Sequence, residues 1–136
     1  MKIKIPERLL KIINPREEKE EISIMSEIEK CGVLIGERKG EEMFVKDIIE
    51  VENDAGSRFY FELKAEKLYK ALIEARKRGM EIIAVFHTHP GGSGRLSSRD
   101  VEGLKNSGIP WVIVGLEGAR AYFYDKGIKE IDLEFY

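Results

Sequence analysis

The 136-residue chain has 43% hydrophobic residues, which is enough for one core, and a single domain over residues 1–136 is expected. Its 23 basic and 25 acidic residues are well mixed, so no basic stripe indicates a nucleic-acid partner. No segment approaches the roughly 20 apolar residues of a membrane helix, and no signal peptide is evident. Cys31 is the only cysteine, which favours a reducing compartment. We therefore expect a soluble cytoplasmic protein with no membrane partner.

The content of charged residues is also informative. They make up 35% of the chain, against an average near 25% in globular proteins. Glutamine, which is thermolabile, is absent. This composition favours a hyperthermophilic source, but it does not bear on the chemistry.

The N-terminal part is expected to contain a short strand and a helix. Residues 2–5 alternate polar and apolar side chains, as a strand at the edge of a sheet does. Pro15, followed by acidic residues, is typical of a first helical turn, and Gly32 is placed to end this helix after about four turns. Glu29 shares a helix face with Ile22 and so leans toward the core.

Strand patterns and a second helix follow in the middle of the chain. Strands are expected at residues 33–35, 43–51 and 59–61, with a charged turn over 37–42 and a polar loop over 53–58. The first two of these strands form a hairpin. Residues 65–78 carry apolar side chains at helical spacing, which makes this the clearest helix of the chain.

The last third begins with an apolar run at residues 82–87, typical of a central strand covered on both faces. A glycine-rich loop follows, and then a short helix that begins at Ser97 or Ser98 and ends near Ser107. Three further strands are expected at residues 111–114, 121–124 and 128–135. Helices interleaved with strands predict an α/β or α+β domain with a mixed sheet.

The two histidines of the chain, His87 and His89, stand two residues apart at the end of the predicted central strand. The period of a strand points both rings to the same side. Asp100 follows in the first turn of the next helix, and the intervening loop can fold its carboxylate back. Two imidazoles and one carboxylate form a three-ligand zinc set that leaves the fourth position open for water, as in catalytic sites.

Each of these residues also has a structural interpretation. His87 and His89 can be ordinary residues of a strand end, and Asp100 alone is an ordinary acidic residue of a first helical turn. The same-side placement of the only two histidines favours the metal site. Cys31 is interpreted as a buried small residue outside the active set.

Two further residues have two interpretations each. Glu29 is either a general base beside the metal or an exposed glutamate near a helix end, and spacing alone favours the latter. Ser97 is either the cap of the helix that holds Asp100 or, near a metal, a stabiliser of a tetrahedral oxyanion. In isolation the cap is favoured.

Taken together, these residues resemble the signature of the JAMM or MPN+ metalloproteases. The segment His-Thr-His-Pro from His87, with Ser97 and Asp100 downstream, matches the family's pattern. Upstream, Glu29 precedes Cys-Gly and an apolar strand, which is similar to the family's glutamate. The resemblance spans roughly residues 15 to 125, and the segment from His87 to Asp100 together with Glu29 carries its specificity.

The resemblance implies an α/β fold, a cytidine-deaminase-like MPN domain with a mixed central β-sheet flanked by helices. It implies a zinc metalloprotease in which His87, His89 and Asp100 hold Zn²⁺. In the same resemblance Glu29 is the acid/base and Ser97 stabilises the oxyanion.

The implied activity is an isopeptidase that hydrolyses the bond after the C-terminal Gly-Gly of ubiquitin-like small modifier proteins. Its partners would be these modifiers and their lysine-linked conjugates, as for free-standing archaeal members of the family. An extended Gly-Gly tail could lie beside an exposed strand near the zinc.

Two alternatives remain open. The same residues would serve a peptidase that processes a sulfur-carrier protein, and relatives that lack the ligands are non-catalytic MPN scaffolds. The presence of all five site residues argues against a scaffold. The oligomeric state, homodimer or monomer, is not specified by the sequence.

Overall fold

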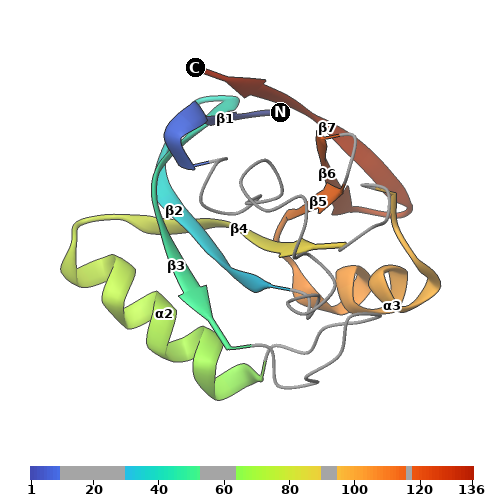
Figure 1. Cartoon of the computed structure of the whole chain (residues 1–136), viewed down its shortest axis with the longest axis horizontal. Helices are drawn as coiled ribbons and strands as arrows, with labels where there is room; N and C mark the ends of the chain where they lie inside the picture. Colours follow the sequence, from blue (N-terminus) through green and yellow to red (C-terminus); the bar gives the residue numbers. More distant parts are fainter. Residues whose placement is uncertain (10–29, 53–63, 90–94, 116–117) are drawn as a thin grey trace, which may run out of the picture.

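The structure is a computed structural model that describes residues 1–9, 30–52, 64–89, 95–115 and 118–136. In this part of the chain the strands form a closed barrel in the order β1-β3-β2-β4-β5-β6-β7 (Figure 1). The strands are β1 (Lys2–Ile5), β2 (Cys31–Lys39), β3 (Glu42–Val51), β4 (Glu81–Thr88), β5 (Trp111–Gly115), β6 (Gly118–Tyr124) and β7 (Ile128–Phe135). Two longer helices, α2 (Ala65–Lys77) and α3 (Ser98–Ser107), lie outside the barrel.

The predicted hairpin is confirmed, but its strands are longer than expected. β2 and β3 pair antiparallel over nearly their whole length, from Cys31 opposite Val51 to Lys39 opposite Glu42. The turn contains only Gly40 and Glu41. Gly40 has a φ of +64°, a left-handed conformation that favours glycine. The charged residues assigned to a turn belong to strand ends that reach beyond the core into water.

The first strand closes the barrel, so the expectation of an edge strand is wrong. Ile3 of β1 is in parallel register with Met43 of β3 and with Leu133 of β7. Both Ile3 and Ile5 are fully buried. The alternation of residues 2–5 correctly indicates one buried face, but it carries no information on how many neighbours the strand has.

The sheet is mixed, as predicted. The pairs of β1 with β3, of β1 with β7 and of β4 with β5 are parallel, and the other pairs are antiparallel. β4 lies between β2 and β5 and is buried over most of its length, which confirms the expected central strand. The closure of the sheet was not predicted. The cytidine-deaminase-like arrangement stays a prediction.

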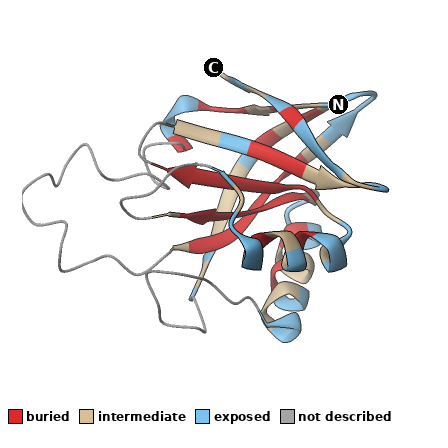
Figure 2. Ribbon diagram, turned by 90° about the vertical axis from the view of Figure 1, so that its right-hand side faces the viewer, coloured by how far each residue is buried: buried red, intermediate tan, exposed pale blue. Residues whose placement is uncertain are grey.

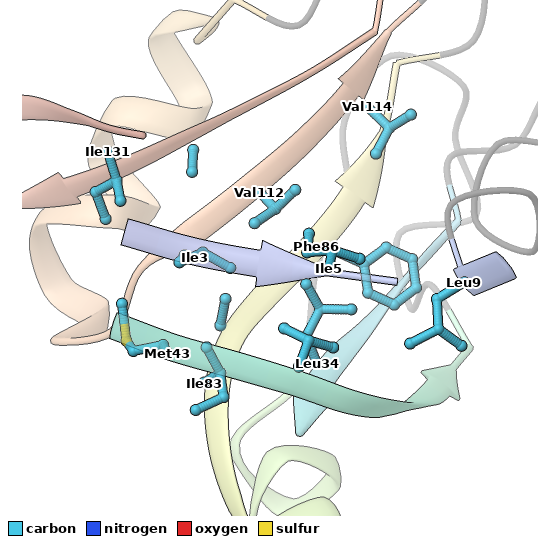
Figure 3. Close-up of a cluster of buried hydrophobic side chains, with 13 residues drawn as sticks. Ile3, Ile5, Leu9, Leu34, Met43, Ile83, Phe86, Val112, Val114 and Ile131 are labelled. Carbon is cyan, nitrogen blue, oxygen red and sulfur yellow. The ribbon is translucent and has the colours of Figure 1, made fainter. Parts of the chain in front are cut away.

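Two apolar clusters cover the two sides of the barrel wall. Figure 3 shows the interior cluster, in which side chains from all seven strands, from Ile3 of β1 to Ile131 of β7, point toward one another. The second cluster lies between the wall and the helices, and it includes Ala71 and Ala75 of α2 and Leu104 of α3. The helices remain exposed on their outer side (Figure 2). Both helices therefore cover the outer face of the barrel wall, α2 against β2 and β4 and α3 against β6.

The sequence predicts that Gly32 ends a helix, but Gly32 has a different structural role. It lies within β2 rather than at the end of a helix. A Cβ atom there would stand 2.2 Å from the carbonyl oxygen of Ile49 on the neighbouring strand, so only glycine permits this approach. The predicted helix from Pro15, the loop at 53–58 and the strand at 59–61 lie outside the described residues. In the described part, no helix combines the length and apolar character needed to span a membrane.

Candidate metal centre

Strand β4 and its first following residue place the two histidines. His87 is the second-last residue of β4, and His89 comes directly after the strand. The main-chain N–H of His89 donates to the carbonyl of Val114 on β5 at 2.8 Å, which continues the ladder past the strand end. The two Nε2 atoms lie 3.3 Å apart. The same-side arrangement predicted from strand period is confirmed.

The third residue, Asp100, is held by the first turn of α3. Ser97 is the N-cap, and its hydroxyl accepts the main-chain N–H of Asp100 at 3.1 Å. In return, Oδ2 of Asp100 accepts the main-chain N–H of Ser97 at 2.9 Å. This reciprocal pair is a capping box with aspartate at its third position. It fixes the carboxylate in direction, because one oxygen is bound to the helix start.

The carboxylate of Asp100 spans both imidazoles. Its Oδ1 lies 3.0 Å from Nε2 of His87, and its Oδ2 lies 3.1 Å from Nε2 of His89. Ligand atoms of the three side chains all fall within 4.8 Å of one another. Within the described residues this is the group of histidine, cysteine and acidic side chains that could hold a metal ion.

These separations fit a single zinc ion. Tetrahedral zinc with bonds of about 2.0–2.1 Å would place its ligand atoms roughly 3.3 Å apart. The two imidazole nitrogens are 3.3 Å apart, close to that value, and each has one carboxylate oxygen of Asp100 at 3.0 or 3.1 Å. Two nitrogens and one carboxylate also match the donor types of catalytic zinc sites, which keep one position open. The residues present therefore fit the group that the motif implies.

Burial sets the protonation of the group. His87 is fully buried, and this burial lowers the pKa of its imidazole, although Asp100 acts in the opposite direction. Burial alone would raise the pKa of Asp100, but hydrogen bonds with His87 and His89 and from the Ser97 amide together hold it well below its usual range. A neutral imidazole beside an ionised carboxylate is the state that binds a metal cation.

An aromatic contact supports His87 from the β5 side. The ring of Trp111 meets the imidazole edge-on, with centroids 5.5 Å apart. Trp111 lies under α3 where Gly103 leaves room for it, because a Cβ atom there would stand 2.4 Å from Cη2 of the indole. The absence of a side chain at position 103 thus allows the indole to fill the space between α3 and His87.

The structure brings together His87, His89, Asp100 and the main chain of Ser97, as the sequence predicts. Ser97 is exposed and forms the predicted cap. Cys31 is buried at the start of β2, with its thiol donating to the carbonyl of Val51, which confirms its interpretation as a core residue. Glu29 lies outside the described residues.

Two residues of the site are not predicted from the sequence. The pattern at residues 111–114 predicts only a strand, and Thr88 only separates the two histidines. The contact of Trp111 depends on Gly103, and a glycine within a helix pattern was the one available signal. The contacts of Thr88 depend on strand register, which no local pattern reveals.

Comparison with solved structures shows the fold. The chain is similar to protein DSY2949 from Desulfitobacterium hafniense, with a TM-score of 0.79, 20% identity, and coverage of 100% of this chain and 93% of that one. It is also similar to a protein from Salinibacter ruber, with a TM-score of 0.66, 23% identity, and coverage of 100% and 92%.

Two curated relatives share more sequence with the chain. A desampylase from Pyrococcus furiosus is 33% identical over 93 residues, which are 68% of this chain and 64% of the relative. A probable TtuB-protein conjugate cleaving protease from Thermus thermophilus is 35% identical over 60 residues, or 44% of this chain and 40% of the relative. The chain thus aligns with less than two thirds of the length of either relative.

A family model provides broader coverage. Residues 8–125 match the model described as prokaryotic homologs of the JAB domain. The match begins after β1, ends just past β6, and includes every residue of the candidate metal centre. Because it covers most of the chain, the protein belongs to the prokaryotic homologs of the JAB domain.

Proposed function

We propose that the protein is a zinc-dependent isopeptidase that hydrolyses the bond after the C-terminal Gly-Gly of ubiquitin-like small modifier proteins. The observation that carries the proposal is the convergence of His87, His89 and Asp100 within 4.8 Å. These three residues would hold Zn²⁺. When bound, zinc would act as a Lewis acid that polarises a carbonyl and lowers the pKa of a bound water to about 7.

The protonation of two ligands, His87 and Asp100, supports this assignment. His87 is kept neutral by burial, so its Nε2 can present a lone pair to the ion. Asp100 is ionised and contributes one negative charge, which leaves a positive net charge at the centre. The capping box holds Asp100 in place before any metal binds, which reduces the reorganisation needed on binding.

Glu29 is proposed as the general base. It takes a proton from the attacking water and passes it to the lysine nitrogen as the C–N bond breaks. The products are a modifier with a free carboxylate and an unmodified lysine. The assignment rests on the motif, in which Glu29 precedes the strand that pairs with β4.

Ser97 is proposed to stabilise the oxyanion. Its hydroxyl oxygen already accepts the N–H of Asp100, but a hydroxyl has one proton to donate as well. Ser97 is exposed, so the capping contact and the donation are compatible. Both interpretations of Ser97 can therefore hold together.

The substrate class is supported by the two curated relatives. One is named a desampylase, and the other is named for the cleavage of TtuB-protein conjugates. We propose that this chain has the same kind of activity. Residues 1–136 would form one domain with a cytidine-deaminase-like arrangement. The protein would act in the cytoplasm. A peptidase for a sulfur-carrier protein and a non-catalytic scaffold remain the alternatives.

The decisive experiment incubates the zinc-loaded protein with a Gly-Gly-ending modifier joined to a lysine side chain, and in parallel with a linear fusion of the same modifier. Preferential release from the lysine conjugate is expected. Chelated protein and the His89→Ala variant are the matched controls, and both should be inactive. Preferential cleavage of the linear fusion would favour a processing peptidase. A purified protein that holds no zinc and loses no stability in chelator would favour the scaffold.

A further inference from the structure

Thr88, the residue between the two histidines, makes an unusual pair of hydrogen bonds with Lys30. Its main-chain N–H donates to the carbonyl of Lys30 at 2.9 Å, and its hydroxyl accepts the main-chain N–H of Lys30, also at 2.9 Å. In a regular antiparallel pair both bonds join main chain to main chain. Here a side chain takes one of the two positions, just beyond the register pair of Cys31 and His87.

The surroundings of Thr88 make this pair of hydrogen bonds with Lys30 rigid. The side chain is buried, at 9% exposure, so water competes weakly for its hydroxyl. A β-branched side chain has restricted rotamers, which keeps the hydroxyl directed at its partner. Strand alternation places the hydroxyl on the opposite face from the imidazoles of His87 and His89, so it does not compete for a metal.

We propose that Thr88 is a positioning residue for Glu29. Lys30 is bonded directly to Glu29, and consecutive Cα atoms are 3.8 Å apart. By holding the main chain of Lys30 against β4, Thr88 fixes the residue that follows Glu29 in the chain relative to the two histidines. The proposal rests on the proposed role of Glu29 as base. A misplacement of about 1 Å in a catalytic group can cost 100-fold in rate.

The first test compares three substitutions at position 88. Thr88→Val keeps the shape and loses the hydroxyl, and it should lower kcat by about 10- to 100-fold while KM and zinc stoichiometry stay unchanged. Thr88→Ala is a second removal variant and should behave alike. Thr88→Ser retains the hydroxyl, and its kcat should stay within about threefold of that of the parent protein. If neither removal variant binds zinc, the hydroxyl supports the metal ligands instead and the proposal is wrong.

Ser107→Ala is the matched control. The Ser107 hydroxyl also accepts a main-chain N–H, that of Ile109 at 3.3 Å, in a part-buried setting. It lies at the opposite end of α3 from Asp100, about 10 Å along the helix axis. This variant should lose stability but keep kcat. A loss of kcat equal to that of Thr88→Val would mean that general destabilisation explains both.

A double-mutant cycle with Glu29→Gln closes the test. If Thr88 acts through Glu29, then Thr88→Val should slow the Glu29→Gln protein by less than twofold in single-turnover assays. A full 10- to 100-fold further loss would overturn the positioning role and leave the base assignment intact. Unchanged turnover in Glu29→Gln alone would instead refute the assignment of Glu29 as base. Thr88 would then have no catalytic group to position.

Discussion

Trp111 contacts the buried imidazole of His87 edge-on, and it can do so only because residue 103 of α3 has no side chain. Alanine within a helix is normally better than glycine by roughly 0.5–1 kcal/mol. Gly103→Ala should nevertheless lower the free energy of unfolding by about 1–2 kcal/mol, because its Cβ would overlap the indole. Urea unfolding of the metal-free protein measures this.

A second substitution, at Trp111, should partly restore the stability that Gly103→Ala loses. The overlap involves Cη2, an atom of the six-membered ring of the indole that phenylalanine lacks in that position. Gly103→Ala combined with Trp111→Phe should therefore be less destabilised than the sum of the two single variants. A Gly103→Ala protein more stable than the parent would show that the indole moves away freely, contrary to the packing argument.

Removal of one ligand should abolish metal binding. In His89→Ala, one imidazole and the carboxylate remain, and two ligands do not hold zinc tightly in water. We expect a loss of stoichiometric zinc by mass spectrometry and a loss of hydrolysis. Zinc should also raise the melting temperature of the parent protein, because 100-fold excess over the Kd contributes about 2.7 kcal/mol. Tight zinc in His89→Ala would disprove the ligand set.

Glu29→Gln should separate metal binding from catalysis. The three ligands are unchanged, so zinc stoichiometry should match the parent protein. Loss of a general base lowers the rate by about 10²- to 10⁴-fold. The measurement is kcat for a lysine-linked conjugate alongside zinc content. Parental turnover would rule out the proposed base, and a loss of zinc would place Glu29 among the ligands.

The stability of the metal-free protein should depend on pH through His87. Burial lowers the pKa of His87 in the folded state, so below its ordinary value of 6.5 the unfolded chain binds more protons than the folded one. Stability should therefore fall as the pH drops below about 6.5, by at most about 1.4 kcal/mol per pH unit for this group. Asp100, whose folded pKa is lowered, adds a further loss below its ordinary value of 3.8.

Urea titrations in chelator between pH 5.5 and 7.5 test the histidine contribution. The slope should become smaller in His87→Gln, which has no titrating ring at the buried position. A flat profile in the parent protein would mean that the folded state accommodates a protonated His87, in conflict with its burial.

The parts of the fold that sequence predicted well are those specified by local patterns. The bounds of β7 agree with the prediction, and α2 differs by a single residue at its end. Period-two alternation and helical spacing are properties of neighbouring residues, so they are readable without knowledge of the partners. The same holds for the same-side placement of His87 and His89 and for the helix start at Ser97.

The parts that were not predicted depend on long-range pairing. The double pairing of β1 and the approach of Gly32 to β3 each involve a residue distant in sequence. The space at Gly103 depends on how α3 packs on Trp111, which helical spacing does not specify. The contacts of Thr88 with Lys30 join residues 58 positions apart. Such contacts follow from register and packing, and glycine or threonine in an otherwise regular segment gives only a general signal that something approaches.

The N-terminal strand has a consequence beyond completing the core. An open sheet would end in two rows of unpaired amide and carbonyl groups, on which further strands from other molecules can add. β1 occupies the edges that β3 and β7 would otherwise present. These four residues therefore protect the protein against aggregation by strand addition, a useful property for a chain whose composition indicates life at high temperature.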